Sequence, residues 1–209
     1  MLFLHRIHAA PFRNLDFEEA NTNSTREGSG PITDLLPGWQ IYEGTNVVGT
    51  IGYNYRPLGI GYGTLIPRDQ ATNYGPVSLS GNYAIYLLPK TGASYSLVQR
   101  GDIPADARAL AFVGFGSILG FGSQGIRLEA SVNGTTLTFL TGFQEWDVSA
   151  FAGQTAELKL TLPGELGFFG DTRIAFDSLY FVPEPTSFNL FGLVGLSLVF
   201  PLVRRRFRK

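Results

Sequence analysis

Apolar and polar residues alternate with a period of two along most of the chain. In residues 126–133 and 157–162, every second side chain is apolar and those between are polar or charged. This pattern is typical of antiparallel strands with one face on a core and the other in solvent. Asn133-Gly134 lies between two such runs and predicts a tight hairpin, because both turn positions need positive φ. Further predicted strands are 40–43, 47–51, 77–80, 83–88, 95–100, 109–115, 136–140 and 173–181.

Short strands separated by turn residues predict an all-β fold. The chain has 26 glycines and 12 prolines, and no stretch of it shows a long amphipathic helical pattern. We therefore expect an antiparallel β-sandwich of jelly-roll type, occupying residues 14–182 as one domain. The polar segment 21–30 is expected to form an exposed loop.

The C-terminal segment has a different composition. After Pro183, Glu184 and Pro185, residues 188–203 carry no charged side chain, and five of the last six residues are basic. As a helix these sixteen residues would reach roughly 24 Å, which just crosses a bilayer once the flanking residues are counted. By the positive-inside rule the basic end stays cytoplasmic, so the body would lie beyond the inner membrane. A buried core helix with a basic end is the alternative, although the segment has no polar face.

This order of features resembles the PEP-CTERM sorting signal of Gram-negative bacteria. The resemblance covers residues 182–209 and implies recognition by the integral-membrane processing enzyme exosortase through Pro183, Glu184 and Pro185. It also implies a transmembrane helix over 188–203 and retention by Arg204, Arg205 and Arg206. The precursor would be anchored in the inner membrane, and the mature protein would reach the cell surface or the extracellular space.

The N-terminus lacks the pattern that export requires. Only Met1–Leu4 form an apolar run, whereas a secretory signal needs a positive start and 7–15 apolar residues. Residues 1–13 are interpreted as the remnant of a leader. Two explanations stay open: the true start lies upstream, or this copy has lost export.

Composition narrows the classes of function. The chain has no cysteine, which removes disulfides, thiol nucleophiles and cysteine metal sites. Without the basic end, 11 basic residues against 17 acidic ones leave a net charge of −6. A nucleic-acid partner is therefore not expected, because a phosphate-binding face needs positive charge.

A second resemblance concerns the body of the chain. The stretches at 14–21 (NLDFEEAN), 36–42, 146–162 and 174–181 (IAFDSLYF) are similar to galactose-binding-like jelly rolls and carbohydrate-binding modules. In many of these modules an opening Glu and a closing Asp, with backbone carbonyls, hold a structural calcium ion. The matching residues are Glu18 and Asp177, and calcium accepts such oxygen ligands. The alternative makes Glu18 a solvated edge residue and Asp177 a turn or bulge residue.

Enzymatic activity is not expected. The only histidines, His5 and His8, lie in the leader-like segment, so the body offers no histidine base, triad or zinc ligand. Its carboxylates show no spacing that singles out a catalytic pair.

Sugar binding would need exposed aromatic rings. The candidates for ligand binding are Tyr53, Tyr55 and Tyr62, in a glycine-rich stretch, and Trp39, for which a place in the core is the stronger alternative. The sequence thus predicts an exported, non-enzymatic surface or matrix protein that binds polysaccharide. A purely structural surface protein without a ligand, and an uncleaved membrane-anchored periplasmic protein, are the alternatives.

Overall fold

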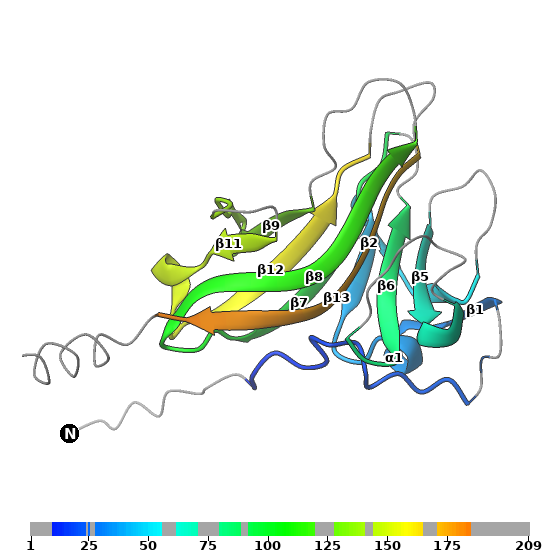
Figure 1. Ribbon diagram of the computed structural model, residues 1–209, viewed down its shortest axis with the longest axis horizontal. Coiled ribbons are helices and arrows are strands. Elements are labelled where there is room, and N and C mark those ends of the chain that lie inside the picture. The colour runs from blue at the N-terminus through cyan, green and yellow to red at the C-terminus, as the bar shows by residue number, and fades with distance from the viewer. Residues whose placement is uncertain are drawn as a thin grey trace, which may run out of the picture.

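Two β-sheets packed face to face form the body of the chain (Figure 1). The computed structural model describes residues 10–23, 25, 28–55, 62–70, 80–88, 92–119, 128–140, 144–164 and 171–184. Helix is confined there to short turns, among them α1 (Ile32–Leu35) and the 3-10 turn η2 (Ser149–Phe151). The predicted all-β sandwich is confirmed for the described residues.

Seven strands form the first sheet, and neighbouring strands pair antiparallel except for β4 and β5, which are parallel. In spatial order they are β1 (Gly28–Pro31), β4 (Thr50–Tyr53), β5 (Tyr62–Pro67), β6 (Tyr83–Leu88), β13 (Asp171–Pro183), β8 (Ala107–Leu119) and β11 (Glu145–Asp147). Figure 1 shows the two longest strands, β8 and β13, running side by side across the molecule.

The second sheet has six strands, all paired antiparallel. Their order is β10 (Thr135–Thr136), β9 (Glu129–Val132), β12 (Thr155–Leu162), β7 (Tyr95–Asp102), β2 (Gln40–Glu43) and β3 (Asn46–Val48).

The alternation of the sequence fills the space between the sheets. On β12 the even-numbered residues from Ala156 to Leu162 are buried, and the residues between them are more exposed. Asn133 and Gly134 have φ values of 49° and 79°, as the predicted hairpin between β9 and β10 requires. The alternating apolar positions of the sequence are therefore the buried positions of these strands.

The N-terminal strap (residues 10–23) crosses the end of the sandwich and binds both sheets (Figure 1). On the side of the second sheet, the Arg13 N–H donates to Gln99 Oε1 at 2.6 Å and Gln99 Nε2 donates to the Arg13 carbonyl at 2.9 Å. On the side of the first sheet, the Leu179 N–H donates to the Leu15 carbonyl at 3.0 Å. The strap thus holds β7 and β13 at the same end of the fold.

Phe17 closes this end of the core. Its side chain is fully buried, and its ring centre lies 5.7 Å from that of Phe176 and 6.1 Å from that of Trp39. Its φ is 61°, a left-handed conformation that costs a residue with a Cβ roughly 1–2 kcal/mol. Burial of the ring offsets that cost.

Several predicted strand boundaries were wrong. The predicted strand 47–51 is two strands, β3 and β4, in different sheets, because the chain crosses between the sheets at Gly49. The predicted strand 136–140 contributes one residue to β10 and an isolated bridge between Phe139 and Trp146. The predicted loop 21–30 ends in strand β1, which pairs with β4. The side-chain pattern of β1 does not indicate a strand, because the pairing is made by backbone groups. Of the predicted strand 77–80, only Ser80 is described.

Both termini lie partly outside the described residues. Among the residues that the structure describes, no helix has the length and apolar character of a membrane span. The predicted span 188–203 and Arg204–Arg206 lie beyond the described part. Residues 10–13 belong to the predicted leader remnant, yet Pro11 forms a bridge with Asp102, and the ring of Phe12 packs on that of Phe181.

We predict that Phe17→Ala destabilises the protein strongly, because it empties the core end while keeping the unfavourable φ. The expected loss is about 3–5 kcal/mol of unfolding free energy in urea denaturation. Val47→Ala is the control: this side chain is 66 % exposed, and its loss should change stability by less than about 0.5 kcal/mol. A similarly small effect of Phe17→Ala would contradict the role of the strap as a closure.

Candidate functional site

Glu18 attaches the strap to the turn before β6. Its Oε1 accepts hydrogen bonds from the backbone N–H groups of Asn82 at 2.6 Å and Tyr83 at 2.9 Å, and its Oε2 accepts from Asn82 Nδ2 at 2.8 Å. At Gly81 a Cβ would lie 2.2 Å from Glu18 Oε1, so only glycine allows this close approach. Glu18 is therefore an anchor for a backbone turn and not a solvated edge residue.

Asp177 reaches the same turn from β13. The residue is 1 % exposed, and its Oδ2 accepts a hydrogen bond from the Ser80 N–H at 2.8 Å. Its Oδ1 is buried and has no hydrogen-bond partner among the described residues. A register shift follows directly, and Ser178 has a φ of 50°, so Asp177 also begins a β-bulge as the alternative interpretation expected.

The two carboxylates influence each other. Burial raises the pKa of Asp177, hydrogen bonds from Ser80 and Ser178 oppose that rise, and the negative charge of Glu18 adds to it. Within the described ranges, neither carboxylate forms an ion pair with a basic side chain; the described ion pairs are Arg13–Glu19 and Arg108–Glu145. The structure thus brings Glu18 and Asp177 to one turn and leaves their charges without a described cation.

These residues fit part of a calcium site. Asp177 Oδ1 is buried without a hydrogen-bond partner among the described residues, and Glu18 Oε2 accepts one hydrogen bond, whereas Glu18 Oε1 already accepts two. The described part of the chain holds no group of three or more Asp, Glu or His side chains suited to a metal. Since calcium takes six to eight oxygens, backbone carbonyls would have to supply most of its ligands. A cation here would join the strap to β13 by satisfying the buried Asp177 oxygen.

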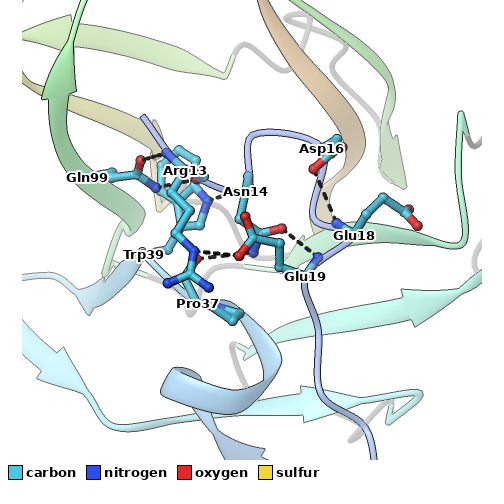
Figure 2. A network of polar contacts seen from close by, with 8 residues as sticks. All are labelled: Arg13, Asn14, Asp16, Glu18, Glu19, Pro37, Trp39 and Gln99. Atoms are coloured by element: carbon cyan, nitrogen blue, oxygen red, sulfur yellow. Dashed lines mark hydrogen bonds and ion pairs between the residues drawn. The ribbon is translucent and has the colours of Figure 1, made fainter. Parts of the chain in front are cut away.

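Trp39 is not available to a ligand, which corrects the prediction that included it. The residue is 3 % exposed, and its indole N–H donates to the Asn14 carbonyl at 2.9 Å. Figure 2 shows Trp39 beside Arg13 and Asn14 of the strap and near Pro37, which precedes β2. The ring packs in the core because it follows the turn at Pro37-Gly38, where β2 enters the sandwich.

The predicted tyrosines occupy different environments. Tyr53 is half-buried at the end of β4, with its ring centre 6.4 Å from that of Tyr83. Burial raises the pKa of Tyr53, the neighbouring Tyr83 adds to the rise, and a hydrogen bond with Thr22 of the strap lowers it. Tyr55 is 48 % exposed, and its backbone N–H donates to Thr64 Oγ1 at 3.3 Å. Tyr62 begins β5, and its side chain lies outside the described residues.

Tyr83 and Asn82 were missed at the sequence level. Ser80-Gly81-Asn82 has turn composition before a predicted strand, so a turn at this position is readable from sequence. The sequence does not predict that Glu18 binds this turn, because the two segments are far apart in the chain and meet only through the strap.

Comparisons with known proteins support no family assignment. No family model matches the chain, and no curated protein matches it. Among solved structures, TmCBM61 in complex with beta-1,4-galactotriose is 14 % identical, with a TM-score of 0.42 over 82 % of this chain and 97 % of that one. The enzymatically active domain of tailspike protein 4 from bacteriophage CBA120 is 13 % identical, with a TM-score of 0.36 over 70 % of this chain and 19 % of that one. Neither similarity assigns a role to a residue of this chain.

We predict that Asp177→Asn stabilises the calcium-free protein at neutral pH. The pKa of Asp177 is raised in the folded state above about 3.9 in the unfolded state, so protonated Asp177 favours folding and its ionisation opposes folding. The stability that wild type has below the unfolded pKa is lost as the pH rises through the folded pKa. The advantage of Asp177→Asn in urea denaturation should therefore be smallest near about pH 3 and grow toward about pH 7.

Calcium chloride should reverse this order. A bound ion stabilises wild type, by about 2.7 kcal/mol at a hundred times its Kd, and Asp177→Asn should lose most of that gain. Glu129→Gln, which removes an exposed carboxylate on β9, is the matched control and should respond to calcium as wild type does. Equal calcium responses in all three proteins would show that Glu18 and Asp177 hold no metal.

Proposed function

We propose that this chain is an exported, non-enzymatic protein of the cell surface or extracellular matrix that binds polysaccharide. Exosortase would recognise Pro183, Glu184 and Pro185, and the apolar span 188–203 would anchor the precursor in the inner membrane. The support for this sorting route is the order of tripeptide, span and basic end in the sequence.

The observation that supports binding is the exposed aromatic surface at the end of the first sheet. Tyr55 presents 48 % of its surface to solvent, although a ring of this size is usually more buried. The Tyr53–Tyr83 ring pair lies close by in sequence and structure, because Tyr53 ends the strand that precedes Tyr55. Exposed tyrosine rings stack on the C–H faces of sugars and supply a hydroxyl for hydrogen bonding. This combination suits a glycan ligand.

Asp177, at the end of the fold that the strap covers, is better suited to a structural role than to a catalytic one. Asp177 is a carboxyl with a raised pKa, the kind of group that can act as a general acid. It is only 1 % exposed and hydrogen-bonded to the Ser80 backbone, so a substrate cannot reach it in this conformation. Its environment fits a structural role in holding the strap.

We predict that Tyr55→Ala weakens polysaccharide binding without unfolding the protein. In affinity gel electrophoresis with neutral polysaccharides, its apparent Kd should rise roughly five- to tenfold, the loss expected for one stacked ring. Tyr42→Ala is the matched control, since Tyr42 lies on β2 in the opposite sheet. If Tyr55→Ala and Tyr42→Ala migrate like wild type in every polysaccharide gel that retards wild type, Tyr55 is no part of the binding surface.

The sorting route predicts the mass of the mature protein. In the native host, the form found outside the inner membrane should end near Pro185, as measured by intact mass spectrometry of cell and medium fractions. A chain that retains Lys209 in the membrane fraction would favour the uncleaved anchored protein. The full chain in the cytoplasm would contradict export altogether.

A further inference from the structure

A second exposed ring lies on the outer face of the first sheet, on β13 between two residues that contact the strap. Tyr180 is 49 % exposed, and it forms none of the described ring–ring contacts. Its neighbours in sequence face the opposite way: Leu179 is 3 % exposed and belongs to the core, and Phe181 packs against it. Tyr180 therefore points outward from the sheet, with about half of its surface in solvent.

The strand register places two alanines between this ring and β11. Tyr180 pairs with Ala111 on β8, and Ala111 pairs with Glu145 on β11. Two residues further along β13, Val182 pairs with Ala109, and Ala109 pairs with Asp147. The two alanines face outward, because Leu110 between them belongs to the core, but they are only 0 % and 1 % exposed, so neighbouring side chains cover them.

Charged groups lie beyond the two alanines, on the side away from Tyr180. Across two strand spacings, roughly 10 Å, lie the carboxylates of Glu145 and Asp147. Arg108 joins them, with its Nη2 3.7 Å from Glu145 Oε2. Its Nε is buried and has no hydrogen-bond partner among the described residues, whereas 42 % of the side chain as a whole is exposed.

Two β-bulges create this arrangement. The register between β13 and β8 shifts once between Asp177 and Tyr180 and again between Val182 and Pro183. The second shift leaves Arg108 as the extra residue on β8, which turns its side chain to the outer face beside Glu145. Bulges often redirect a side chain next to a functional site.

Asp147 is held in a fixed orientation. Its Oδ1 accepts hydrogen bonds from the Ser149 N–H at 2.9 Å and the Ser149 hydroxyl at 2.6 Å. These bonds, and more weakly the charge of Arg108, hold the pKa of Asp147 below its usual range. The carboxylate is thus an ionised, pre-oriented acceptor on β11.

We propose that Tyr180, Arg108, Glu145 and Asp147 form a binding site for a neutral sugar residue of a polysaccharide. A pyranose ring would stack on Tyr180, and the sugar's hydroxyls would face the carboxylates and the exposed part of the Arg108 guanidinium. This inference rests on the proposed polysaccharide binding and assigns it a second site, on a different part of the sheet from Tyr55.

The charges favour a neutral sugar over an acidic one. Arg108 is already paired with Glu145 and lies near Asp147, so the three groups together carry one net negative charge. An acidic sugar would be repelled by the carboxylates, and an apolar protein surface would desolvate the ion pair without replacing its hydrogen bonds. Sugar hydroxyls donate to carboxylates and accept from a guanidinium, so they satisfy both signs of charge.

The test uses the full chain in affinity gel electrophoresis with dextran, galactomannan and xylan as neutral polysaccharides and alginate as an acidic one. Tyr180→Leu removes the ring but keeps an apolar side chain, and it should weaken binding to the neutral polymer that retards wild type by roughly tenfold. Tyr180→Phe keeps the ring and should bind within roughly threefold of wild type. Glu145→Gln should weaken binding without changing the unfolding midpoint, because the side chain is partly exposed.

Tyr42→Leu on the opposite sheet is the matched control and should bind as wild type does. Neutral-polymer retardation should persist in high salt, because no net charge is exchanged. Wild-type binding that is unchanged in Tyr180→Leu and Glu145→Gln would overturn this site and leave the proposed function standing. Retardation of wild type only by alginate, and only at low salt, would overturn the neutral-sugar assignment. No retardation of wild type by any polymer would overturn the site and the proposed function together.

Discussion

The fold depends on how the N-terminal strap closes the end of the sandwich. A two-layer β-structure buries its core between the sheets, but its end stays open unless another segment covers it. Phe17 fills this end, and the polar groups around it secure the strap. Figure 2 shows the backbone of Arg13 bonded to Gln99 and that of Asn14 bonded to Trp39, while the Glu18 side chain points away from both. The Glu18 carboxylate binds the turn before β6 in the first sheet. One short segment thereby satisfies backbone groups of both sheets.

This closure also explains why Glu18 and Asp177 lie together at the turn before β6, a contact that the alternating pattern of the sequence does not indicate. Asp177 loses nearly all of its exposure when the turn at Ser80 is held against β13, and its charge is then poorly solvated. The outer face of the first sheet beyond the first bulge of β13 is not covered by this turn. There Tyr180 and the Arg108–Glu145 pair stay accessible on strands that the core holds rigid, which is the setting that a pre-formed binding surface needs.

The sequence predicted those features that depend on local pattern. Alternation identified β12 and β9, and Asn133-Gly134 identified a hairpin, because side-chain period and turn chemistry act within a few residues. Strands β1 and β5 were missed because they are rich in glycine or lie in a turn-like context, where backbone pairing decides the structure. The meeting of Glu18 with Asp177 was expected from a family resemblance. The site around Tyr180 was not, because it depends on two register shifts that no local pattern marks.

The most direct test of a polysaccharide-binding sandwich is chemical-shift mapping of the isotope-labelled protein by NMR during titration with oligosaccharides from a neutral polymer. Binding as described here would shift the resonances of Tyr180, Ala111 and Glu145, and those around Tyr55, in a saturable way. The resonances of β2 and β3 in the opposite sheet would stay unchanged. Saturable shifts confined to that opposite sheet, or no shifts at all with any neutral oligosaccharide, would contradict the account.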